Sequence, residues 1–213
     1  MSPDPALTGL FAGIGQYYDH KISAYGATPL GVDWSCVPTQ ELRFLQLLKL
    51  CDFSAPFSLN DLGCGYGALL AFLKKRHSRC QVDYLGVDIS AGMVNEARRL
   101  WRKQLNCSFV IAGVSPRVAD YSVASGIFNV QQDAPLPQWT HFVEHMLSNL
   151  NATSRRGFAV NFLAPPQAGM AQVPGLYRTA AQPWLDYCRK NFARKTEVLQ
   201  GYGMLEFTLI VRD

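Results

Sequence analysis

The sequence predicts an α/β fold, in which a parallel β-sheet is covered by helices on both faces. The main observation is a repeated alternation of strand-like and helix-like segments from residue 57 onward. The chain has 213 residues, 48% of them hydrophobic and 17% charged, and can bury the core of one domain. Two apolar runs near the C-terminus, joined by a turn that contains Gly203, predict a closing antiparallel pair.

The strands are predicted from short apolar runs bounded by turn residues. The run FSLNDL at residues 57–62 comes first, and VDYLGV at 82–87 follows it. The next three runs are CSFVIA at 107–112, YSVASG at 121–126 and GFAVNFL at 157–163. The closing pair consists of TEVLQGY at 196–202 and EFTLIVR at 206–212.

Helices are expected between these strands. Residues 67–77 follow the first strand, and the segment after the second strand has Ser90 as a good N-cap before an apolar stripe. Further helices are expected at about 139–150 and within 177–192, where Pro183 predicts a break or a restart. Residues 39–51, TQELRFLQLLKLC, predict a helix that covers the sheet.

Composition and charge exclude several classes of protein. No apolar stretch approaches the roughly 20 residues of a membrane span, and the N-terminus lacks the basic start of a signal peptide, so a cytoplasmic protein is expected. The net charge of +4 is spread over short basic groups, which makes a nucleic-acid partner unlikely. The six cysteines form no C-x-x-C pair and have no histidine cluster beside them, so no metal site is predicted.

The segment NDLGCGYGALL, residues 60–70, places three glycines at alternate positions between a strand and a helix. Gly63 and Gly65 can take positive φ and let the main chain approach a ligand, while Gly67 lets the next helix pack tightly. In a parallel sheet, ligands bind beyond the carboxyl ends of the strands. This turn is therefore the expected cofactor cradle.

Asp88 gives the second signal, because it stands at the end of the second predicted strand. An acid there, about 20 residues beyond the glycines, can accept hydrogen bonds from the two ribose hydroxyls of a cofactor. The alternative is a surface or capping carboxylate. Together with the glycine turn, Asp88 predicts a cofactor of the adenosine type.

Two such cofactors fit the glycine pattern. Gly63, Gly65 and Ala68 satisfy the dinucleotide fingerprint, which leaves a nicotinamide enzyme open. Asp61, however, places a carboxylate two residues before the first glycine, where it would repel a pyrophosphate. S-adenosylmethionine carries an ammonium and a sulfonium, and both are favoured beside a carboxylate. The acid therefore favours S-adenosylmethionine.

At this point the sequence resembles the class I, Rossmann-like S-adenosylmethionine-dependent methyltransferases. The segments that carry the resemblance are DLGCGYGALL, YLGVDISAGMVNEAR, YSVASGIFNV and GFAVNFL, within residues 57–213. The resemblance implies a seven-stranded, mostly parallel sheet with an antiparallel last strand, helices on both faces and an N-terminal helical lid. It also implies S-adenosylmethionine as cofactor and S-adenosylhomocysteine as product.

The resemblance also implies a set of cofactor contacts. The methionine part would lie against the turn, Asp88 would bind the ribose, Ile89 would meet the adenine, and Ser125 and Gly126 would meet the amino group. The acid that often meets the adenine is absent from IAGVSP, where Gly113 and Ser115 are the candidates. The full cofactor set is Asp61, Gly63, Cys64, Gly65, Gly67, Asp88, Ile89, Met93, Gly113, Ser115, Ser125, Gly126 and Arg43, the last of these for the cofactor carboxylate.

The N-terminal segment is expected to form a cap over the cofactor. Residues 1–55 would be this helical cap or lid, and residues 56–213 would form the cofactor-binding domain. A lid excludes water and shapes the substrate pocket, although a simple packing extension would explain the same aromatic residues. Tyr18, His20 and Asn129 are the candidate catalytic residues, which would contact the methyl acceptor.

The resemblance favours direct methyl transfer to a nitrogen or oxygen of a small molecule. The fourth-strand segment SGIFN lacks the two prolines and aromatic typical of base-amine methylation, and it lacks a catalytic cysteine. No acidic cluster suited to magnesium is present. The alternatives are an RNA or protein methyltransferase and, further off, a nicotinamide-dependent oxidoreductase. No membrane partner is expected, and the chain is predicted to be a monomer or a homodimer.

Overall fold

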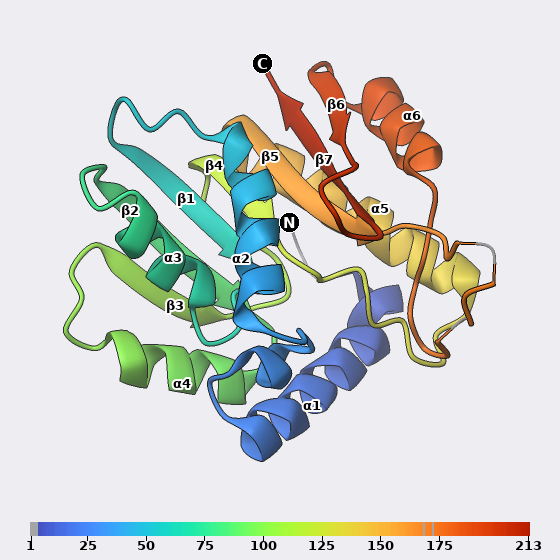
Figure 1. The fold of residues 1–213 in the computed structure, drawn as a ribbon, viewed down its shortest axis with the longest axis horizontal. Coiled ribbons are helices and arrows are strands. Elements are labelled where there is room, and N and C mark those ends of the chain that lie inside the picture. Colours follow the sequence, from blue (N-terminus) through green and yellow to red (C-terminus); the bar gives the residue numbers. More distant parts are fainter. Residues whose placement is uncertain (1–3, 168, 172) are drawn as a thin grey trace.

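The computed structural model describes residues 4–167, 169–171 and 173–213. Within these ranges one seven-stranded sheet has the order β3-β2-β1-β4-β5-β7-β6 (Figure 1). The strands are β1 Phe57–Leu62, β2 Val82–Asp88, β3 Cys107–Ile111, β4 Ala119–Ala124, β5 Ser154–Leu163, β6 Lys195–Leu199 and β7 Glu206–Arg212. β1 to β5 pair in parallel, and β7 is antiparallel to both β5 and β6. The predicted sheet, with its antiparallel last strand, is confirmed.

Five of the seven strand predictions differ from the structure by one to three residues at an end. β4 ends at Ala124, two residues before the predicted end, because the chain turns at Gly126, which has φ 80°. The last two strands are joined by residues 200–205, a longer connection than the predicted tight turn. Gly201 and Gly203 both adopt positive φ there, as a reversal of this kind requires.

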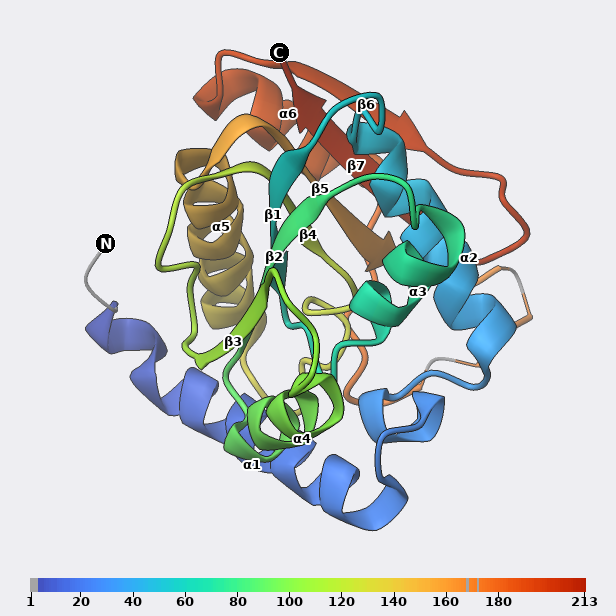
Figure 2. The ribbon, with the colours of Figure 1, turned by 90° about the vertical axis from the view of Figure 1, so that its left-hand side faces the viewer.

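The helices cover both faces of the sheet. They are α1 Thr8–Tyr25, α2 Val37–Leu47, α3 Ala68–Arg76, α4 Ala91–Trp101, α5 Leu136–Ala152 and α6 Ala181–Asn191, with the short 3₁₀ turns Pro5–Leu7, Pro29–Val32 and Leu48–Leu50. The helices α2, α3 and α4 lie on one face, and α5 and α6 lie on the other (Figures 1 and 2). In the described ranges, none of these helices combines the length and hydropathy needed to cross a bilayer.

The helix predicted within residues 177–192 begins only at Ala181. Pro183 therefore stands in its first turn, where a backbone N–H has no partner within the helix, so the proline does not break it. Residues 177–180 are instead a connection that follows the end of β5. Their position matters for the site, because Thr179 N donates to the Leu163 carbonyl over 3.0 Å.

Each face of the sheet has its own apolar core. On the face of α2, α3 and α4, Phe44, Leu73 and Val94 pack with Tyr84 and Phe109 of the strands. On the other face, fully buried aromatic rings stack from strand to helix. Phe128 lies 4.8 Å from Phe162, which lies 5.7 Å from Trp184, measured between ring centroids. These stacked rings fix the ends of β4 and β5 against α6.

The helix α1 lies across the carboxyl ends of the strands. In Figure 2 it runs from below α5 to below α4. Its first half packs on the α5 face through Leu10, Phe11 and Ile14, and the ring of Phe11 contacts that of Phe142 edge to face at 5.7 Å. No helix stands between β3 and β4, where the described chain passes through residues 112–118 as a loop. The N-terminal segment therefore covers that part of the sheet.

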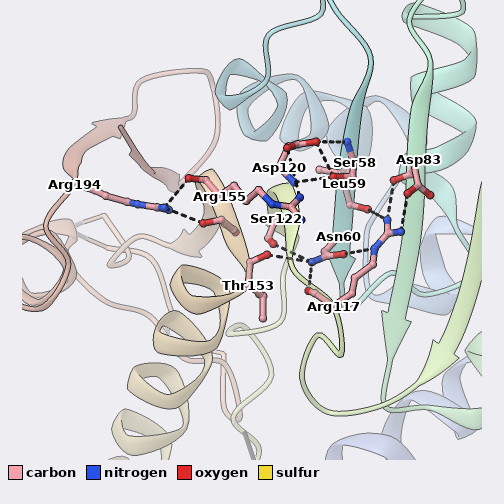
Figure 3. A network of polar contacts seen from close by, with 11 residues as sticks. Ser58, Leu59, Asn60, Asp83, Arg117, Asp120, Ser122, Thr153, Arg155 and Arg194 are labelled. Carbon is pink, nitrogen blue, oxygen red and sulfur yellow. Dashed lines mark hydrogen bonds and ion pairs between the residues drawn. The ribbon is translucent and has the colours of Figure 1, made fainter.

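The opposite, amino-terminal edge of the sheet is held by a polar network (Figure 3). The Asn60 amide, fully buried in β1, donates to the Arg117 carbonyl over 3.0 Å and accepts from Arg117 Nε over 3.1 Å. Arg117 also forms an ion pair with Asp83 over 2.8 Å. Asp120 accepts hydrogen bonds from both the backbone and the hydroxyl of Ser58. This network satisfies buried polar groups, so it stabilises the sheet far from the carboxyl edge.

Candidate functional site

A cavity of about 620 Å³ lies between α1 and the carboxyl ends of β1, β2, β4 and β5. Its walls include the glycine turn, the ends of β2 and β4, and aromatic side chains of the N-terminal segment. A volume of this size suits a small-molecule site. The cavity brings together all but three of the residues that the sequence predicts: His20, Gly67 and Ser115 do not line it.

The glycine turn has the conformation that its sequence predicts. Gly63, Gly65 and Gly67 have φ of 74°, 54° and 85°, a region that favours glycine. A Cβ on Gly65 would lie 2.9 Å from Val32 Cγ1, within the cavity wall. A Cβ on Gly67 would instead lie 2.5 Å from the indole nitrogen of Trp101 on α4. The absence of a side chain at Gly67 therefore allows α4 to pack closely against the turn.

Asp88 connects the glycine turn to the start of α4. Its carboxylate accepts from Gly65 N over 2.8 Å and from Ser90 N over 2.9 Å. Ser90 caps α4, as predicted, by accepting from Met93 N over 3.0 Å. Burial raises the pKa of Asp88 to about 6, although its backbone hydrogen bonds act in the opposite direction.

Asp61 is a second buried carboxylate on the same wall. It accepts from the Tyr84 hydroxyl over 2.5 Å, and only 2% of the residue is exposed. Burial raises the pKa of Asp61 to about 7, and the nearby charge of Asp88 adds to this rise. Two carboxylates that are held in low dielectric favour a cation between or beside them.

Four more of the predicted cofactor-binding residues line the cavity, and a fifth does not. Cys64, Ile89, Met93 and Gly113 all line the cavity. Ser115 does not, because its backbone N–H donates to Asn149 Oδ1 of α5 over 3.0 Å and the residue is buried on that side. The missing helix between β3 and β4 explains the difference, since this loop folds onto α5.

The turn after β4 presents two buried polar atoms to the cavity. Ser125 Oγ and Asn129 Oδ1 have no hydrogen-bond partner among the described residues, and both side chains line the cavity. Gly126 N donates to Asn161 Oδ1 over 2.7 Å, and a Cβ on Gly126 would lie 2.5 Å from the ring of Trp34. Buried groups of this kind are normally satisfied, so a ligand is the expected partner.

Arg43 lines the cavity but is committed to a buried ion pair. Its Nε donates to Glu206 Oε2 over 2.9 Å, its Nη2 pairs with Glu206 Oε1, and its Nη1 donates to the Thr39 carbonyl. The guanidinium stacks on Trp34, 3.7 Å from the ring centroid. Glu206 in turn accepts from Asn161 Nδ2 over 3.0 Å. The positive charge of Arg43, which was expected to bind the cofactor carboxylate, is therefore already neutralised by Glu206.

Tyr18 and His20, the two candidate catalytic residues of the N-terminal segment, lie on different sides of α1. Tyr18 lines the cavity, and burial raises the pKa of its hydroxyl well above the usual value. His20 follows two residues later, roughly 200° around the helix, and is exposed to solvent. His20 is therefore left out of the site.

Asp19 fixes α1 to the rest of the site. Its Oδ1 accepts from the Ser90 hydroxyl over 2.6 Å and from Gly92 N over 2.8 Å, at the start of α4. One turn earlier, Gly15 lets α1 approach the end of β2. A Cβ on Gly15 would lie 3.5 Å from the Ile89 carbonyl oxygen. No local pattern predicts this contact, because it joins residues about 70 positions apart.

Comparisons with known proteins agree with this geometry. The family model described as a methyltransferase domain matches residues 60–152. A protein of Mycobacterium tuberculosis (strain ATCC 25618 / H37Rv) named "Putative methyltransferase Rv1506c" is 39% identical over 165 residues, which cover 78% of this chain and 98% of that protein.

Two solved structures share the fold. Magnesium protoporphyrin IX methyltransferase (ChlM) from Synechocystis PCC 6803 with bound SAM has a TM-score of 0.62 at 16% identity, with all of both chains covered. Human N-acetylserotonin methyltransferase in complex with SAM also has a TM-score of 0.62 at 16% identity. This chain is covered completely in that match and spans 60% of the human chain.

The sheet order, the glycine turn and the acid at the end of β2 define a Rossmann-like, cofactor-binding α/β protein. With the identity to the mycobacterial protein, they show that the chain belongs to the class I S-adenosylmethionine-dependent methyltransferases. Its enzymatic class is the transfer of one-carbon groups, and S-adenosylmethionine is its cofactor.

Proposed function

We propose that this enzyme methylates a nitrogen or oxygen atom of a small molecule. The observation that carries the proposal is the cavity itself, which has a limited volume of about 620 Å³ and is covered by α1. Such a space suits a cofactor with a small acceptor, whereas a polymer substrate needs an open groove. The aromatic wall formed by Phe11, Tyr18, Trp34 and Phe142 suits an acceptor with an apolar body.

The residues of the cavity fit the cofactor. Asp88 would accept the ribose hydroxyls, Asp61 would face the positively charged methionine part, and Ile89 and Gly113 would border the adenine. When bound, the cofactor supplies a methyl group on a sulfonium leaving group. The glycine turn would allow the close approach that this requires, since side chains at Gly63 and Gly65 would collide with the cavity wall.

The chain's own contribution to the reaction would be alignment and exclusion of water. Proper orientation of two reacting groups can supply about 7–11 kcal/mol of the barrier. Asn129 Oδ1, buried and without a partner in the described part of the chain, would accept a hydrogen bond from the acceptor's N–H or O–H. Tyr18 stays protonated because of its raised pKa, so it would position the acceptor as a neutral hydroxyl and would not act as a base.

Calorimetric titration with S-adenosylhomocysteine, with reduced nicotinamide cofactor as the control, tests the cofactor side of the proposal. We expect micromolar affinity for the first ligand and no heat from the second. A screen of small phenols and amines with radiolabelled S-adenosylmethionine then tests the acceptor class. Label transferred to RNA or protein in preference to these compounds would contradict it.

The affinity for S-adenosylhomocysteine should rise with pH. In the free protein the pKa values of Asp61 and Asp88 are about 7 and about 6. An ammonium beside Asp61 and hydroxyl donors at Asp88 stabilise the ionised carboxylates, so both pKa values fall on binding and protons are released. We expect Kd to be at least about tenfold higher at pH 5.5 than at pH 8, with a plateau only above about pH 8, where Asp61 is fully ionised.

The same titration in buffers of different ionisation enthalpy measures the released protons directly. The variant Asp61→Asn should bind more weakly at pH 8 and lose the part of the pH dependence centred near pH 7. Equal affinity of the wild type at both pH values would contradict the proposed role of these carboxylates.

Detaching α1 should weaken cofactor binding moderately. Asp19→Ala removes the acceptor for the Ser90 hydroxyl and Gly92 N, and the loss of a cap of this kind costs about 1 kcal/mol. We expect faster hydrogen exchange in α1 and a Kd for S-adenosylhomocysteine raised about fivefold. His20→Ala, on the solvent side of the same helix, is the matched control and should change neither. Unaltered exchange in Asp19→Ala would show that this contact does not hold α1.

A further inference from the structure

The two ends of the cavity carry opposite charges. Asp61 and Asp88 are held at the ends of β1 and β2. Arg178 lines the same cavity from the connection that follows β5. Because β4 separates β1 from β5 in the sheet and neighbouring strands are about 4.8 Å apart, the ends of β1 and β5 lie about 10 Å apart across the sheet.

Backbone contacts fix Arg178 from both sides. Tyr177 N donates to the Asn129 carbonyl over 2.8 Å, and Thr179 N donates to the Leu163 carbonyl over 3.0 Å. The guanidinium Nη1 donates to the Ala164 carbonyl over 2.8 Å. The side chain is half-buried and is positioned beside the turn that carries Asn129.

No carboxylate of the described residues forms an ion pair with Arg178. Arg43, the other cation that lines the cavity in the described ranges, is paired with Glu206. None of the ion pairs among the described residues involves Arg178, and its bond to the Ala164 carbonyl is the only hydrogen bond that its side chain forms with them. The side chain therefore retains donors on Nε and Nη2, enough for one bidentate oxygen pair.

The wall around this arginine is largely apolar, and Gln132 joins Asn129 as a polar residue there. Val130, Leu163 and Leu176 line the cavity beside it, with the unpartnered Asn129 Oδ1 nearby on the same turn. We propose that the methyl acceptor is a carboxylic acid with an apolar body, and that Arg178 binds its carboxylate. A single guanidinium with one nitrogen already engaged suits the monoanion of a carboxylic acid better than a phosphate dianion. This inference rests on the proposed function and specifies its acceptor.

The test compares acids with their neutral isosteres on the protein saturated with S-adenosylhomocysteine. The probes are a set of monocyclic aromatic carboxylic acids, each paired with its primary carboxamide, and binding is measured by ligand-observed NMR titration. On the wild type we expect acids to bind at least tenfold more tightly than amides. Arg178→Gln should reduce this preference to within twofold, Arg178→Lys should keep part of it, and Arg189→Gln, exposed on α6, should keep all of it.

The affinity for S-adenosylhomocysteine separates the possible explanations. In all three variants this affinity should stay within twofold of the wild-type value. Retained binding of S-adenosylhomocysteine also shows that the variants are folded. Equal binding of acids and amides to the wild type, or no binding of acids, would overturn the inference. A tenfold loss of S-adenosylhomocysteine affinity in Arg178→Gln would assign the arginine to the cofactor carboxylate and also overturn it. A wild type that fails to bind S-adenosylhomocysteine would contradict the proposed function itself.

Discussion

Replacing Asp88 by alanine should reduce the affinity for S-adenosylhomocysteine by about 100-fold or more. In the proposed complex its carboxylate accepts hydrogen bonds from ribose hydroxyls, and hydrogen bonds to charged groups contribute about 1.5–3 kcal/mol each. The same carboxylate accepts from Gly65 N and Ser90 N, so its loss also loosens the glycine turn. The loss of the ribose hydrogen bonds and the loosening of the turn both weaken the binding of S-adenosylhomocysteine. Calorimetric titration at pH 8 measures the loss.

Two further variants separate charge from shape at this position. Asp88→Asn keeps the size of the side chain and one oxygen acceptor, and we expect it to lose less affinity than Asp88→Ala. Asp83→Ala removes a carboxylate from the other end of β2, where it pairs with Arg117 at the amino edge of the sheet. That control should bind S-adenosylhomocysteine normally. Wild-type affinity in Asp88→Ala would remove Asp88 from the cofactor site.

The features around the cavity whose local structure the sequence predicted correctly depend on local patterns. The strand at residues 57–62, the glycines that follow it and the N-cap at Ser90 are each defined by neighbours in the chain. Position at the end of a strand was enough to bring Asp61 and Asp88 to one cavity wall. Their positions could be predicted without information about distant parts of the chain, because parallel strands end at a common edge.

The parts that the sequence did not predict depend on contacts between distant segments. Arg43 was assigned to the cofactor, but its partner Glu206 stands 163 residues further along the chain. Asn161 interrupts the apolar run of β5 and Glu206 begins the apolar run of β7, and this placement was the available signal that the two polar side chains are buried and paired. His20 was paired with Tyr18 because the limits of α1, and so the orientation of its faces, were not predicted.

The buried ion pair of Arg43 and Glu206 leads to the second large prediction. Glu206→Ala should lower the free energy of unfolding by about 3–5 kcal/mol, because it leaves a buried guanidinium without its counter-charge. Only 6% of Arg43 and 4% of Glu206 is exposed, so water cannot replace the lost partner. Urea unfolding followed by circular dichroism measures this change. Glu197→Ala, which removes a partly exposed pair with Arg212 on the neighbouring strands, should cost less than about 1 kcal/mol.

A double variant distinguishes loss of the pair from loss of packing. In Arg43→Met/Glu206→Leu the buried charges are both replaced by apolar side chains, which is often neutral or stabilising at such sites. We expect it to be more stable than Glu206→Ala alone. It should nevertheless disturb the cavity, because Arg43 supports the ring of Trp34 and Glu206 holds Asn161, which accepts from Gly126 N. A Glu206→Ala variant as stable as the wild type would mean that the pair contributes nothing to the fold. Full S-adenosylhomocysteine affinity in the stable double variant would mean that the network does not position the turn after β4.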